Sequence, residues 1–72
     1  MVILKYDSTN QERINRIKAT MAINDHTKAK LAELLGISKT AILQKLAGKR
    51  PWQVIELEAL ADIYDVNRSY FF

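Results

Sequence analysis

Residues 27–50 read TKAKLAELLGISKTAILQKLAGKR, and this stretch decides the fold. Apolar residues recur in it at helical spacing on both sides of Gly36, which predicts two short amphipathic helices. Glycine enters the left-handed backbone region at little steric cost, so Gly36 is suited to end the first helix. Thr27 and Ser38 belong to the residue types that cap helix N-termini. The stretch therefore predicts two helices joined by a tight turn over about residues 27–47.

The second of these helices has a polar outer face. Ile42 and Leu46 fall on its apolar side, while Thr40 and Gln44 point away from that pair at about 100° per residue. Lys39 lies at the N-terminal end, which is the end that usually meets base edges in a helix-turn-helix. The pattern predicts a helix-turn-helix that presents this helix to the major groove of DNA.

A first helix is predicted upstream of this motif. Thr9 and Glu12 have capping-box spacing, so the helix is expected to begin after Asn10, with residues 1–9 as an N-terminal tail. The helix is expected to end at residues 24–25, where the apolar spacing stops.

The downstream segment predicts two more helical elements. Gln53 is placed to cap a fourth helix, and Asn67 to cap a last short turn of helix. We therefore expect a single all-α domain over residues 1–72, built from five short helices. The predicted core comprises Ile14, Ile17, Met21, Leu31, Ala32, Leu34, Leu35, Ile42, Leu46, Trp52, Leu57, Leu60, Ala61, Tyr64, Tyr70, Phe71 and Phe72.

The charge of the chain is concentrated in its middle third. The net charge is +3, yet residues 28–50 carry six basic side chains and one acid, whereas residues 51–72 carry a net charge of −3. A basic excess on the predicted motif favours attraction to phosphates.

Cysteine is absent, which excludes disulfides and thiolate metal sites. The apolar residues 2–4 are too few for a signal peptide or a membrane span, so a cytoplasmic protein without membrane contact is expected.

The register of the motif resembles the Cro/repressor-type helix-turn-helix family, often called XRE-like. That family has a small residue within its first motif helix, a glycine four residues later, and a branched apolar anchor six positions further; here these are Ala32, Gly36 and Ile42. The GKRP turn at residues 48–51 and the segment LEALADIYDV at residues 57–66 also look like the usual sequel. The resemblance implies a lambda-repressor-like fold. It also implies a small phage or bacterial transcriptional regulator that binds operator DNA in a Cro-like switch.

The predicted DNA contacts divide between bases and phosphates. Gln44 suits a bidentate contact to adenine and Lys39 a contact to guanine, with Thr40 beside them. Leu43 flanks this face, where it can meet a thymine methyl group or an apolar protein surface. Lysine at position 28 stands where the family commonly has glutamine, and still reaches a phosphate as a point charge. The predicted DNA-binding residues are Lys28, Ser38, Lys39, Thr40, Leu43, Gln44, Lys45, Lys49 and Arg50.

Two surfaces are candidates for binding protein. A module of this size normally binds DNA as two copies, so either surface suits a self-dimer or a partner repressor. On the predicted fourth helix, Ile55 occupies a first-turn position where acidic residues are electrostatically favoured. The interface candidates are Val2, Leu4 and Tyr6 in the tail, and Ile55, Ala59 and Asp62 on the fourth helix.

A second functional hypothesis belongs to another class. The chain also resembles the modulator-of-repression proteins of temperate lactococcal phages, which implies an antirepressor that binds a partner repressor and DNA only weakly. The acidic C-terminal segment, Leu43 and Ile55 favour this alternative, because an acidic and apolar surface complements a basic DNA-reading face.

No catalytic pattern is present in the sequence. His26 is the only histidine, and no G-x-S-x-G, glycine-rich phosphate loop or zinc-ligand spacing accompanies it. We expect a protein that is not an enzyme, without a cofactor, a metal or a small-molecule substrate.

Overall fold

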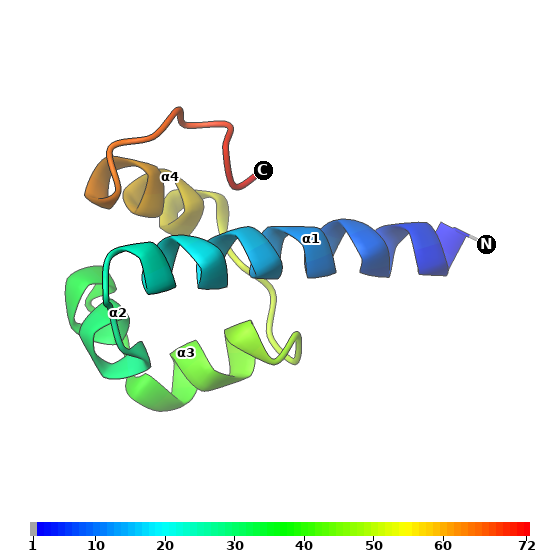
Figure 1. The fold of residues 1–72 in the computed structure, drawn as a ribbon. Helices are drawn as coiled ribbons and strands as arrows, with labels where there is room; N and C mark the ends of the chain where they lie inside the picture. The colour runs from blue at the N-terminus through cyan, green and yellow to red at the C-terminus, as the bar shows by residue number, and fades with distance from the viewer. Residues whose placement is uncertain (1) are drawn as a thin grey trace.

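The computed structural model describes the backbone of residues 2–72 and the side chains of residues 10–72. The described part is all-α and contains no strand, which confirms the predicted all-α class. Its four helices are α1 (Val2–Ile23), α2 (Lys28–Leu35), α3 (Lys39–Leu46) and α4 (Val54–Ile63). In Figure 1, the long helix α1 runs between α4 and the α2–α3 pair, and its N-terminal end extends past the other helices. No helix of the described part is long and apolar enough to cross a membrane.

The turn between α2 and α3 forms as the sequence predicts. The Thr27 hydroxyl accepts a hydrogen bond from the Lys30 N–H at 3.1 Å, and the Ser38 hydroxyl accepts one from the Ala41 N–H at 3.1 Å. Both helices therefore begin with a satisfied side-chain cap. Gly36 ends α2 with a φ of +70°, in the left-handed region that glycine tolerates best.

One apolar core joins the four helices to the C-terminal segment. Leu34 of α2 was predicted to be buried, but its side chain is 39% exposed. Leu31, Ala32 and half-buried Leu35 face the core, and Leu34 is rotated about 100° from Leu35, outside this face. The buried members of the core cluster are Ile14, Ile17, Met21, Leu31, Ala32, Ile42, Leu46, Trp52, Leu57, Leu60 and Phe71.

The start of α1 differs from the prediction. The helix begins at Val2 instead of after Asn10, so the predicted tail of residues 1–9 belongs almost entirely to α1. Those residues include neither glycine nor proline, and a capping pair such as Thr9 and Glu12 favours a helix start without forcing one. Three of the predicted interface residues have side chains outside the described part: Val2, Leu4 and Tyr6.

The predicted fifth helix is a turn. The Tyr70 N–H donates to the Asn67 carbonyl at 2.9 Å and the Phe72 N–H to the Ser69 carbonyl at 3.1 Å, and no helical ladder follows. Of the three aromatic residues at positions 70–72 that were predicted to be buried, only Phe71 is; Tyr70 is 44% and Phe72 47% exposed.

The C-terminal turn is attached to α1 by two arginines. Arg13 Nε donates to the Phe71 carbonyl at 2.8 Å, and an Arg16 guanidinium nitrogen donates to the Tyr70 carbonyl at 3.3 Å. The Arg16 guanidinium also lies 5.9 Å from the centre of the Tyr70 ring. These contacts explain which aromatic enters the core, because they hold the backbone in a register that turns Phe71 inward.

A contact between His26 and Tyr64 connects the α1–α2 loop to the end of α4. His26 Nδ1 and the Tyr64 hydroxyl oxygen are 2.9 Å apart. The Tyr64 ring also meets Phe71 edge-on, with centroids 6.5 Å apart. Burial raises the pKa of Tyr64 above its ordinary value of 10.0, because a phenolate here would lose hydration.

This shift predicts a loss of stability in alkali. The phenol ionises more readily in the unfolded chain than in the folded one, so the contribution of Tyr64 is fully present below pH 10.0 and is lost as the pH rises above that value. Urea unfolding measured from pH 9 to pH 11 should show a falling free energy of unfolding. Tyr64→Phe should flatten this dependence, whereas Tyr70→Phe should leave it unchanged. An equal slope in all three proteins would contradict the assignment.

Candidate nucleic-acid interface

The outward face of α3 carries the predicted base-reading residues. Thr40 is exposed and Gln44 is half-buried, whereas Ile42 and Leu46 are buried on the opposite side. Lys39 is exposed at the N-terminal end of α3, at the edge of this outward face. The orientation expected from helical spacing is therefore present. Leu43 lies on the same outward face with 42% of its side chain exposed, so this face is mainly polar with one apolar contact point.

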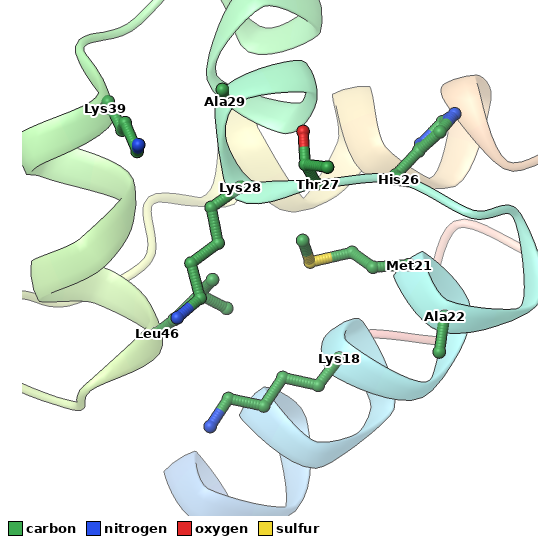
Figure 2. A pocket seen from close by; sticks show the side chains of 9 residues that line it. All are labelled: Lys18, Met21, Ala22, His26, Thr27, Lys28, Ala29, Lys39 and Leu46. Atoms are coloured by element: carbon green, nitrogen blue, oxygen red, sulfur yellow. The ribbon is translucent and has the colours of Figure 1, made fainter.

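The N-terminal ends of α2 and α3 are close to each other. Lys28 and Lys39, the first residues of the two helices, line the same hollow (Figure 2). The partial positive charge of a helix N-terminus adds to each ammonium and favours a phosphate nearby. Ser38 is also exposed at this end, but its oxygen already accepts the capping hydrogen bond, so its hydroxyl can contact DNA chiefly as a donor.

Two more predicted phosphate-binding residues, Lys49 and Arg50, are exposed in the turn after α3. The Lys49 N–H donates to the Gln44 carbonyl at 2.9 Å, so the turn is attached to the end of α3. Gly48 adopts a φ of +78° and reverses the chain there. The cations of this turn are thus held close to α3 by the backbone.

Lys45 was predicted to contact phosphate, and the structure contradicts this. Its side chain is only 5% exposed and its ammonium lies 2.8 Å from Glu56 Oε1. The same ammonium donates to the Pro51 carbonyl at 3.1 Å and lies 5.7 Å from the centre of the Trp52 ring. A cation with these contacts joins α3 to α4 and is inaccessible to DNA.

The angular position of Lys45 could have identified this role. At about 100° per residue, Lys45 falls between Ala41 and Ile42, both buried. Sequence reasoning also missed Glu56, which accepts the Gln53 N–H at 2.8 Å in addition to its contact with Lys45. One carboxylate oxygen therefore caps the start of α4 and neutralises the buried cation.

The predicted protein-binding surface of α4 faces outward. Ile55 is 71% exposed, and its neighbour Val54 is 61% exposed. Ala59 is half-buried and Asp62 exposed, one and two turns along from Ile55.

Comparison with known families gives a match over most of the chain. A family model described as BetR domain matches residues 6–72, which include α2, α3, α4 and most of α1. No curated protein and no solved structure matches the chain significantly.

The Lys45–Glu56 pair leads to a stability prediction. Glu56→Gln leaves a buried ammonium without a counter-charge, so the free energy of unfolding should fall by about 3 kcal/mol. Adding Lys45→Met should recover most of this loss, because no unpaired charge then remains inside. Urea denaturation at neutral pH measures both effects.

The exposed Lys30–Glu33 pair supplies a matched control. Its two side chains are 49% and 73% exposed, so Glu33→Gln should cost about 0.5 kcal/mol or less. If Glu56→Gln lowered the free energy of unfolding as little as this control, the buried pair would not have the stabilising role assigned to it.

Proposed function

The chain belongs to the BetR domain family, and we propose that it is a small cytoplasmic transcriptional regulator that binds double-stranded operator DNA through α3. The observation that carries this proposal is the outward polar face of α3, where Thr40 and Gln44 lie opposite the buried Ile42 and Leu46, with exposed Lys39 at the N-terminal edge of this face. Side-chain caps at both motif helices keep the face rigid, as groove reading requires.

Affinity and specificity come from different side chains in this proposal. Lys28, Lys49 and Arg50 are exposed and bind phosphates, which gives a salt-dependent and nearly sequence-independent attraction. Lys39 and Gln44 read base edges from the N-terminal half and middle of α3. A module of 72 residues covers little DNA, so two copies on a palindromic site supply the operator affinity in a Cro-like switch.

A second candidate function is supported by the apolar residues on the surface. Leu43 flanks the polar residues on the outward face of α3, and Ile55 lies on α4; their side chains are 42% and 71% exposed respectively. An antirepressor would use such residues to bind a partner repressor and would bind DNA only weakly. In that case Asp62, close to Ile55 on α4, would complement a basic surface of the repressor.

Substitutions on α3 test the DNA proposal. Gln44→Ala and Lys39→Ala should each weaken binding to the duplex upstream of the protein's own gene by about 1–3 kcal/mol. Gln44→Ala should spare a scrambled duplex of equal length, because only base contacts are lost. Lys39→Ala also removes a charge near the DNA and should weaken binding to the scrambled duplex as well, but by less. Fluorescence anisotropy of labelled DNA at two salt concentrations measures this difference. Gln11→Ala, the same change on an exposed part of α1, is the matched control and should have no effect. Equal affinity for both duplexes would reject base reading.

Loss of a phosphate contact should change DNA binding in a different way from loss of a base contact. Lys49→Gln should weaken both duplexes equally and lower the slope of log affinity against log salt by about 1. Lys45→Met should leave this slope unchanged, since the Lys45 ammonium is buried in its contact with Glu56. A drop in the slope caused by Lys45→Met would place that cation on the DNA after all.

Mixing the protein with a repressor encoded by a neighbouring gene distinguishes the antirepressor alternative from the operator-binding regulator. Co-elution in gel filtration, lost with Ile55→Asp and retained with Gln44→Ala, would favour the antirepressor. Ile23→Asp is the matched control, because Ile23 is also highly exposed, at 83%, but lies at the end of α1. Specific DNA binding without co-elution would favour the operator-binding regulator.

A further inference from the structure

An open hollow of about 610 Å³ lies where the end of α1 meets the start of α2 and one side of α3 (Figure 2). Its size is within the range of roughly 300–1,000 Å³ that small-molecule sites occupy. Only Lys28 and Lys39 among its lining residues belong to the predicted DNA surface. Contact with a phosphate backbone therefore does not account for the rest of the hollow.

The hollow combines an apolar base with cationic edges. Met21 and Leu46 line it and are 6% and 4% exposed, so they supply an apolar surface that is already part of the core. Three lysines from three helices also line the hollow: Lys18 on α1, Lys28 on α2 and Lys39 on α3. No aspartate or glutamate is among the lining residues. The hollow thus has an apolar part and a cationic part.

The three lysines lack carboxylate partners within the described side chains. The ion pairs found there involve Lys30, Lys45 and Arg68, and none involves the lysines of the hollow. Figure 2 shows Lys18 and Lys28 extending toward the same side of the hollow from two different helices. Like charges gathered without a counter-charge repel one another, and an anion bound between them relieves that repulsion.

We propose that this hollow binds a soluble organic anion that carries a phosphate or carboxylate group on an apolar body. The lysine ammoniums bind the anionic group, and Met21 and Leu46 contact the body. The bound anion neutralises Lys28 and Lys39, so it also weakens DNA binding. That second effect rests on the proposed function, whereas binding of the anion does not.

Octyl phosphate is the probe for a direct test in the absence of DNA. Titration into the ¹⁵N-labelled protein should give saturable shifts of amide signals centred on residues 18–29 and 39–46. Octyl phosphate should bind at least about tenfold more tightly than inorganic phosphate, because burying a few methylene groups is worth that much. Shifts spread over all lysine-bearing segments, or equal affinity for inorganic phosphate, would overturn the proposal.

Two variants probe the two parts of the hollow. Lys18→Gln removes one cation from an exposed position outside the predicted DNA surface and should weaken octyl phosphate binding several-fold. The matched control, Lys49→Gln, loses the same charge in a turn that does not line the hollow and should change the affinity less than twofold. Ala29→Leu keeps every charge and fills part of the hollow from an exposed position, so it should also weaken binding. Unchanged affinity in both hollow variants would overturn the assignment.

Two further measurements separate the possible explanations. Phosphatidylglycerol vesicles present a phosphate group and an apolar body on a membrane surface. If the protein sediments with these vesicles, and Lys18→Gln abolishes the sedimentation, the proposal of a soluble ligand would be overturned. Competition between octyl phosphate and labelled operator DNA tests the coupling. Because the titration contains no DNA, a protein that fails to bind DNA still reports whether the hollow binds its anion.

Discussion

The buried contact between Lys45 and Glu56 determines how α3 is presented to its surroundings. A charged group in a protein interior is tolerated only where partners replace its hydration. Here one ammonium meets a carboxylate at 2.8 Å, a backbone carbonyl at 3.1 Å and an indole ring. Rotating α3 by even one residue would remove all three contacts at once. The polar residues on the outer side of α3 are therefore oriented by the ion pair beneath them.

Local signals were sufficient to predict the α2–turn–α3 unit. Thr27, Gly36 and Ser38 each act within three or four residues of themselves, through a cap or a left-handed turn. Helical spacing likewise predicted that Thr40 and Gln44 would point away from the core. The candidate interface was predictable to the extent that it depends on the geometry of a single short helix.

Features that depend on distant residues were not predictable in the same way. Lys45 was predicted to contact DNA, although its position on α3 favours an inward side chain, and its partner Glu56 is on another helix, 11 residues further along. The hollow beside α3 requires three helices to meet, and no sequence spacing encodes its shape. Capping preference also gave the wrong start for α1, because a favourable cap does not prevent a helix from continuing backward.

The attachment of the C-terminal turn to α1 has a consequence for biosynthesis. Arg13 and Phe71 are separated by 58 residues, yet their hydrogen bond closes the core around a fully buried aromatic ring. A ribosome-bound fragment in which Phe71 has not yet left the ribosome has a gap in the core beside α1. Such a fragment cannot fold with the cooperativity of the complete domain. Completion of this core therefore waits until Phe71 has emerged, although α2 and α3 can form their turn much earlier.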